Sequence, residues 1–273
     1  MFEGIYQLPI GMLAGLTAIV FVGSYWIGCF LLRPLLRIFV KSKGGENSIV
    51  GAVLSAFGVL YGLLLSLIAV AAYQNVSKVG DEAAAEASAL LALYRDVSEF
   101  SFPQNEELRS ELEDYCRVII EEEWAIQRKG RVPIGVSGHV RRIRKALLDF
   151  EPQSDRDRRS QDEALKHFEA LTEHGRYRRY AAQASIPSVM WYVVIVGTLI
   201  NFALMWLFDM KFVTQLFLGG LLAFFLGALI LLIAVLERPY RSVDFGVSPQ
   251  AHQMVLQVIT NDRSASENIN EGP

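Results

Sequence analysis

Cysteine is nearly absent from this 273-residue sequence, which holds only Cys29 and Cys116. One lies in a strongly apolar stretch and the other in a charged one, so they do not form the disulfide framework of a small secreted domain. A reducing cytoplasm is compatible with this usage. Residues 1–9 contain no Lys or Arg, so the positively charged start of a cleaved signal peptide is missing, and we interpret the first apolar stretch as part of the mature protein.

The sequence also lacks the short motifs of common enzyme sites. It contains no phosphate-binding loop, no HExxH and no GxSxG pattern. Its histidines have no accompanying cysteines or close acidic trio to complete a zinc site; they are His139, His167, His174 and His252. We therefore expect no enzymatic activity, no metal and no cofactor.

Charge is missing from four long apolar stretches, residues 8–32, 48–73, 186–208 and 212–236. Each reaches the roughly 20 residues that a helix needs to cross about 30 Å of hydrocarbon. Uniformly apolar stretches exclude the alternating strands of a membrane barrel. The sequence predicts an all-α integral membrane protein with four transmembrane helices and a helical extramembrane domain between the second and third.

The segment between the second and third stretches carries most of the charge. Residues 74–185 hold 18 basic and 21 acidic side chains, a difference of −3. This balance argues against nucleic acid as a partner, because nucleic-acid-binding domains usually show a basic patch or stripe. A segment this polar is expected to lie outside the bilayer.

We divide the chain at the changes in polarity. Residues 1–47 hold the first transmembrane helix and a short basic loop, and 48–100 hold the second transmembrane helix and its continuation. Residues 101–185 form a helical cytoplasmic domain, 186–249 the last two transmembrane helices with a following turn, and 250–273 a polar tail, expected to be disordered from residue 261.

Four spans place both termini and the middle segment on the same side of the membrane. Lys and Arg are nearly balanced between the two sides, so the charge rule leaves the orientation open. The unpaired cysteines and the missing signal peptide favour a cytoplasmic middle segment in a cell inner (plasma) membrane.

The second apolar stretch differs from the others because small residues recur along it at steps of three or four. They form one helical face: Gly51, Ser55, Gly58, Gly62, Ser66, Ala69 and Tyr73. Such a face allows close helix packing in lipid, and small or hydroxyl side chains also leave room for a pore. Both interpretations stay open, and the residues from Ser55 to Tyr73 in this list are our candidates for the pore lining.

No Gly or Pro interrupts residues 73–79, so the second helix is predicted to continue beyond the membrane to about residue 100. Glu82 and Glu86 lie one helical turn apart on this continuation. In a symmetric oligomer they are candidates for acidic rings at a pore mouth, which attract cations. The alternative is an ordinary solvated helix face.

The middle segment predicts three further helices. Pro103 separates the long helix from a second one over residues 106–128, and a shorter helix with apolar residues from 140 to 150 ends at Pro152. Ser154 is a candidate cap for the next helix, which has a basic end. Pro187 fits the first turn of the third transmembrane helix.

Several sequence features occur in an order that resembles the bestrophin-like domain family of bacterial membrane proteins, distant relatives of bestrophin channels. The resemblance covers residues 48–249 and begins with the Gly-rich second span followed by Glu86. The later residues that carry it are Glu123, Trp124, Arg176, Arg179, Pro187, Trp191, Glu237 and Pro239. The last turn departs from the usual pattern, with Glu237, Tyr240 and Ser242 in place of Asp, Phe and Gly.

The resemblance implies a homo-oligomer, with a pentamer favoured, in which the second helix lines a central pore and the helical domain is cytoplasmic. Its partners are then the lipid bilayer and inorganic ions. The alternative hypothesis is a non-conducting membrane scaffold that binds partners through its helical domain. A proton-driven motor stator is a weaker alternative, because the spans contain no acidic residue.

Overall fold

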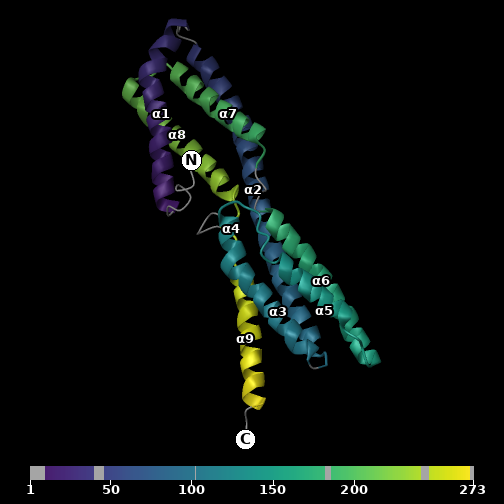
Figure 1. Ribbon diagram of the computed structural model, residues 1–273. Helices are drawn as coiled ribbons and strands as arrows, with labels where there is room; N and C mark the ends of the chain where they lie inside the picture. The colour runs from purple at the N-terminus through teal and green to yellow at the C-terminus, as the bar shows by residue number, and fades with distance from the viewer. Residues whose placement is uncertain (1–9, 40–45, 102, 182–185, 241–245, 271–273) are drawn as a thin grey trace. The chain divides into compact units, whose positions relative to one another are not determined.

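The computed structural model describes residues 10–39, 46–101, 103–181, 186–240 and 246–270, and every regular element within these ranges is helical. The chain forms two compact units. The membrane unit contains α1 (Ile10–Phe39), the first part of α2 (Glu46–Ser98), α7 (Ser188–Leu207) and α8 (Phe212–Leu236). The helical domain contains the rest of α2 and all other helices (Figure 1).

The prediction of an all-α protein with four membrane-spanning helices is confirmed. Four helices are long and apolar enough to cross a membrane, namely α1, α2, α7 and α8. Helix α2 has 53 residues, which at 1.5 Å per residue corresponds to about 80 Å. This is far more than the roughly 30 Å of a hydrocarbon core, so α2 extends out of the bilayer as the uninterrupted sequence over 73–79 predicts.

Aromatic side chains packed against glycines connect the helices of the membrane unit. The Tyr25 hydroxyl of α1 donates a hydrogen bond to the Gln215 carbonyl of α8 (3.4 Å), and the Trp26 ring nitrogen donates to the Leu216 carbonyl (3.2 Å). A Cβ atom on Gly219 would lie 2.0 Å from the Tyr25 ring. The two helices therefore approach closely only because residue 219 has no side chain.

Helix α2 is fixed to α7 in a similar way. The Tyr61 hydroxyl donates a 2.6 Å hydrogen bond to the Val194 carbonyl, and a Cβ atom on Gly197 would lie 2.2 Å from the Tyr61 ring. Leu65 and Ile68 follow Tyr61 on the same face of α2 and are buried in the same apolar cluster. This face of α2 thus packs against other helices of the same chain.

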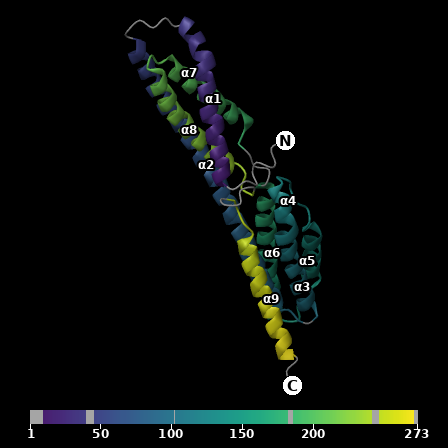
Figure 2. The same cartoon turned by 90° about the vertical axis from the view of Figure 1, so that its left-hand side faces the viewer.

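The helical domain is built around the second half of α2. Its other elements are α3 (Gln104–Val118), the π-helical turn η2 (Ile119–Glu123), α4 (Trp124–Arg128), α5 (Ser137–Asp149), α6 (Asp155–Ala181) and α9 (Gln250–Asn270), seen from two sides in Figures 1 and 2. Leucines at helical spacing on α2, α3 and α5 form the centre of its core, among them Leu90, Leu93, Leu112 and Leu147.

Two local predictions in this domain have informative outcomes. Ser154 caps α6, since its hydroxyl oxygen accepts a 3.1 Å hydrogen bond from the Asp157 amide. The helix predicted over 106–128 is present, but η2 interrupts its regular winding. The apolar spacing in the sequence did not reveal the extra residue that a π turn introduces.

The prediction of a disordered polar tail is wrong for the described residues, because they form α9. His252, Val255 and Ile259 recur at steps of three and four and are buried on one side of this helix. The Cys116 thiol donates a 3.4 Å hydrogen bond to the His252 carbonyl, which attaches α9 to α3. The polar residues on the remaining faces lower the average hydropathy and conceal the short buried stripe.

The glycine contact between α1 and α8 gives a testable prediction. Gly219→Ala places a methyl group within the Tyr25 ring, and overpacking of this kind typically costs about 1–3 kcal/mol. We expect a lower melting temperature for the purified protein in detergent, measured by tryptophan fluorescence. The control is Gly15→Ala on α1, where an added Cβ meets no atom within 4 Å. Equal melting temperatures for the two variants would contradict the packing argument.

Candidate functional site

The small-residue face of α2 takes only a small part in packing within the membrane unit, through Ala69 and through Gly51 beside the Phe208 ring. Ser55 and Ser66 are exposed, and Tyr73 is 62% exposed. A Cβ atom added at Gly58 or Gly62 would meet no other atom within 4 Å. Gly62, Ser66 and Tyr73 lie about 100–140° around the helix from Tyr61, whereas Gly58 lies about 60° from it, at the edge of the packing face.

The remaining candidates on this face follow the same pattern. Ala69 is half-buried, and the Ser66 hydroxyl donates a 2.8 Å hydrogen bond to the Gly62 carbonyl of its own helix. The Ser66 hydroxyl therefore has a hydrogen-bond acceptor within its own helix. At Gly51 an added Cβ would lie 3.4 Å from the Phe208 ring. The predicted pore-lining residues thus form one stripe along α2 that ranges from half-buried to exposed in the protomer.

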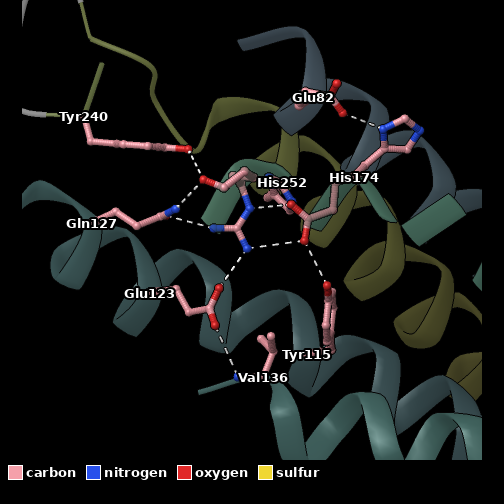
Figure 3. Close-up of polar contacts among 10 residues, drawn as sticks. Glu82, Tyr115, Glu123, Gln127, Val136, His174, Tyr240 and His252 are labelled. Atoms are coloured by element: carbon pink, nitrogen blue, oxygen red, sulfur yellow. Dashed lines mark hydrogen bonds and ion pairs between the residues drawn. The ribbon is translucent and has the colours of Figure 1, made fainter. Parts of the chain in front are cut away.

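Glu86 was predicted at a pore mouth, and the structure places it elsewhere. Its side chain has no exposed area and lies among the helices of the helical domain. It forms an ion pair with Arg178 of α6, while the Tyr115 hydroxyl of α3 donates a 2.8 Å hydrogen bond to its Oε1 atom (Figure 3). A buried carboxylate with these partners is not available to ions in a lumen, so this expectation is wrong.

Arg178 is the centre of this buried cluster. Its Nη2 atom donates to Glu123 Oε2 (2.8 Å) and its Nη1 atom to Gln127 Oε1 (2.8 Å), in addition to the bonds to Glu86. The guanidinium lies over the Trp124 ring, 5.2 Å from its centroid. One cation thus joins residues from α2, η2 and α4, and both carboxylates and the guanidinium are fully buried.

The backbone carbonyl of Arg178 is also hydrogen-bonded to side chains of the cluster. Its carbonyl oxygen accepts hydrogen bonds from Gln127 Nε2 (3.1 Å) and from the Tyr240 hydroxyl (2.8 Å), as Figure 3 shows. Gly175, one turn earlier on α6, lies so near Glu86 that an added Cβ would be 2.6 Å from Oε1. The ion pair therefore depends on a side chain being absent at residue 175.

The pKa values in the cluster follow from burial and from the facing charges. Burial alone raises the pKa of the Glu86 carboxyl, but the Arg178 guanidinium and the His252 ring outweigh burial and hold that pKa well below its usual range. Burial, followed by the Glu86 charge, raises the pKa of the Tyr115 hydroxyl far above its usual value. At neutral pH Glu86 is therefore ionised and Tyr115 is a neutral hydrogen-bond donor.

His252 brings α9 into the same cluster. Its Nε2 atom lies 3.4 Å from Glu86 Oε2, and its ring is 5.7 Å from the Trp124 ring, centroid to centroid. The imidazole is completely buried. The Glu86 carboxylate is its nearest charged group, and neither ring nitrogen makes a hydrogen bond with a described residue.

Glu82, the second predicted pore-mouth residue, also has a partner. Its Oε2 atom lies 2.7 Å from Nδ1 of His174 on α6, and its side chain is 20% exposed. The carboxylate therefore links α2 to α6 in the protomer (Figure 3). Among the described residues no group of three or more His, Cys, Asp or Glu side chains is placed to hold a metal ion.

The residues that carried the family resemblance fall into both units. In the helical domain, Glu123 also accepts a 3.2 Å hydrogen bond from the Val136 amide, and Trp124 Nε1 donates to the Val247 carbonyl (3.2 Å). Arg176 is exposed and Arg179 half-buried on α6, Pro239 is buried, and Ser242 lies outside the described residues.

In the membrane unit, Pro187 directly precedes the first residue of α7, and Trp191 Nε1 donates a 3.3 Å hydrogen bond to Glu237 Oε1 at the end of α8. Trp191 and Glu237, far apart in the sequence, are therefore direct partners. Glu86, Glu123 and Trp124 of the motif meet around Arg178, while Trp191 and Glu237 form a separate pair.

Sequence reasoning missed Arg178, Gln127, Tyr115 and His252 as members of the cluster. Arg178 lies within a run of arginines, and only its position one turn after Gly175 distinguishes it from exposed neighbours. His252 stood in a segment expected to be a tail. Helical periodicity around these residues was the available signal, because each one continues a buried apolar face.

Comparison with known proteins supports a bestrophin-like fold. The model of the Bestrophin-like domain matches residues 19–252. A crystal structure of a membrane protein superposes with a TM-score of 0.60 and 12% sequence identity, over 91% of this chain and 97% of that chain. At this identity the likeness shows the fold alone. A comparison with curated proteins finds no match.

The buried cluster predicts a large effect of Glu86→Gln. Removing one charge of a buried pair typically costs about 3–5 kcal/mol, because the partner stays buried without compensation. The folded pKa of Glu86 is depressed, so its contribution is complete above the unfolded value of about 4.3 and is lost as the pH falls toward the folded value. We expect Glu86→Gln to lower the free energy of unfolding throughout pH 5–7, measured by urea unfolding in detergent.

The matched control is Glu82→Gln, which loses a partly exposed pair with a histidine. Pairs of this kind contribute about 1 kcal/mol or less. If the two variants unfold at the same urea concentration, the buried ion pair does not stabilise the domain as described.

Cys116 gives a second prediction. Burial, followed by the Glu86 charge, raises the pKa of its thiol to about 12. Since the thiolate is the reactive form, we expect alkylation by iodoacetamide at pH 8 to be slower than for a free thiol by about a thousand-fold or more. Labelling is measured by mass spectrometry in a Cys29→Ala background. A Cys116→Ala, Ser101→Cys control places the thiol at an exposed residue, and equal labelling rates in the two proteins would refute the buried environment.

Proposed function

The chain belongs to the bestrophin-like family, and from this premise we propose that it forms an oligomeric ion channel whose pore is lined by α2. The helical domain and both termini are cytoplasmic in this proposal, and the membrane is the cell inner (plasma) membrane. A homo-pentamer is the arrangement that the family resemblance favours. The bilayer and inorganic ions are the partners.

The observation that carries the proposal is the division of α2 into two faces. One face, with Tyr61 and Leu65, is buried against other helices of the membrane unit. The other consists mainly of small residues with open space beside them in the protomer, and a Cβ added at Gly58 or Gly62 would meet no atom within 4 Å. Small side chains give little contact area to lipid, whereas around a symmetry axis they leave space for a lumen.

The hydroxyls on this face suit contact with water or ions. Ser55 and Ser66 are exposed at membrane depth, and Tyr73 ends the face where α2 leaves the apolar stretch. In contrast, exposed leucines occupy the other accessible side of α2, among them Leu60 and Leu67. We assign the leucine side to lipid and the small-residue side to the pore.

The pore mouth in this proposal does not include the two glutamates that the sequence suggested. The buried Glu86 carboxylate is not accessible to ions, and the Glu82 carboxylate already contacts His174. We therefore no longer assign an acidic ring to the channel, and the preference for cations loses its basis. Selectivity in this proposal rests on the small residues and serines of α2.

Reconstitution in planar bilayers tests the proposal. We expect ionic currents from the purified protein, and a smaller single-channel conductance for Gly62→Leu or Ser66→Leu, because a bulky side chain narrows the lumen at these residues. Leu60→Phe is the control, since Leu60 is 67% exposed on the other side of α2. Conductance is measured together with the mass of the oligomer in detergent, so that loss of assembly is distinguished from a blocked pore.

Two outcomes would contradict the proposal. A correctly assembled oligomer without current, in which α2 is sealed or faces lipid, favours a non-conducting scaffold that acts through its helical domain. A conductance that changes equally for Leu60→Phe and Gly62→Leu would show that the small-residue face is not the pore wall.

A further inference from the structure

We propose that the helical domain binds anionic phospholipid headgroups through a surface formed by Lys78 of α2 and by Arg176, Tyr177 and Tyr180 of α6. We call these four residues the headgroup surface. The proposal is independent of conduction, since a channel and a scaffold can both hold a lipid in this way. It concerns the bilayer leaflet next to the domain. It assigns a role to Lys78 and Arg176, which are not part of the buried cluster around Arg178.

Two cations from different helices converge on one exposed aromatic ring. The Lys78 ammonium lies 5.7 Å from the centroid of the Tyr177 ring, and the Arg176 guanidinium lies 5.9 Å from it. Tyr177 is 46% exposed and Tyr180 is 63% exposed. Cation–π contacts hold the positive groups close to each other without neutralising them, so the surface keeps two positive charges for an anion.

Neither cation has an acidic partner in the part of the chain that the structure describes. Lys78 and Arg176 make no ion pair with any described carboxylate, whereas some exposed cations elsewhere in the domain do. Arg142 pairs with Glu111 at 2.8 Å, and Arg263 pairs with Glu113 at 3.0 Å. What distinguishes the headgroup surface is that its two unpaired cations lie against the same exposed tyrosine ring.

The acidic residues nearest in sequence do not cancel this excess. Asp81 and Glu173 each lie one helical turn from one of the two cations, but neither forms an ion pair with them. Glu82 is held by His174 at 2.7 Å. A phosphate group can approach Lys78 and Arg176 together, because no internal anion occupies the space between them.

Lys78 lies close to the membrane-spanning part of α2 along the same helix, and the α6 residues lie close in sequence to the start of the third apolar stretch. Lys78 follows Tyr73, the last residue of the apolar stretch, by five residues of continuous helix, or about 7.5 Å at 1.5 Å per residue. Ala181 ends α6 five residues before Ile186, and five extended residues reach about 17 Å at most. The Lys78 distance compares with a headgroup layer of about 5–8 Å on each side of the hydrocarbon, and the second value is an upper limit for the end of α6.

The residue types match this location. Tyrosine is enriched at the membrane–water interface, where its ring and hydroxyl meet different surroundings. Lysine and arginine near the ends of transmembrane helices attract anionic lipids at short range. Lys78 is five residues beyond Tyr73, which is about 140° around the helix from the small-residue face. On α2 itself, Lys78 and Tyr73 therefore lie on different sides of the helix.

The experiment measures lipid preference of the full-length protein in nanodiscs of three parts phosphatidylcholine to one part phosphatidylglycerol. Native mass spectrometry of the released protein counts the lipids that remain bound. We expect retained phosphatidylglycerol to exceed its bulk share for the unmodified protein. In Lys78→Gln, Arg176→Gln the ratio is expected to fall to the bulk value. High salt during release is expected to lower the enrichment, because the attraction is electrostatic.

The matched control is Arg158→Gln, Arg159→Gln, which removes the same charge from exposed residues at the opposite end of α6. We expect this control to keep the full enrichment. A second arm adds inorganic phosphate to the protein in pure phosphatidylcholine nanodiscs, where we expect no rise in melting temperature, in contrast to the rise that phosphatidylglycerol produces.

Three results would overturn the proposal: unchanged enrichment in Lys78→Gln, Arg176→Gln, an equal loss of enrichment in the control, or equal stabilisation by free phosphate. Melting temperatures of both double variants in pure phosphatidylcholine show whether the protein is folded. These results do not depend on current, so failure of the lipid proposal and failure of the channel proposal are distinguishable.

Discussion

The helical domain depends on one buried ion pair, the contact between Arg178 of α6 and Glu86 of α2. A guanidinium and a carboxylate without exposed area are costly to bury, and only nearly complete hydrogen bonding makes this tolerable. Glu123, Gln127 and Tyr115 supply the remaining bonds. Each of these residues comes from a different turn of the domain, so the charges can be satisfied only when α2, α3, η2, α4 and α6 occupy their final positions.

Such a cluster selects one arrangement of helices more strongly than an apolar core does. Leucines such as Leu90 and Leu112 tolerate small shifts, because dispersion contacts are not directional. The bonds around Arg178 have fixed directions, and a shifted helix would leave a buried charge without a partner. In the membrane unit the corresponding constraint is steric. Gly219 and Gly197 receive the rings of Tyr25 and Tyr61, and this fixes where the helices meet.

The sequence predicted the fold well because length and polarity determine it. Four uncharged stretches of sufficient length require membrane helices, and the unbroken sequence after Tyr73 requires a helix that continues. The site was less predictable. Glu86 and Arg178 carry the same charges as their exposed neighbours, and their burial results from tertiary packing around Gly175. The tail was misjudged because α9 buries a narrow stripe, too short to raise the average hydropathy of its segment.

Because of the π turn η2, an insertion or deletion of one residue in this part of the chain would disturb the packing of the residues that follow. A π turn holds one residue more than the α-helical turn it replaces, so the residues before and after it are out of phase by about 100° relative to a regular helix. Deleting one residue would restore regular winding and rotate Trp124 and Gln127 away from Arg178. Insertions and deletions here therefore act on the charge cluster as strongly as substitutions within it, although no charged residue need be lost.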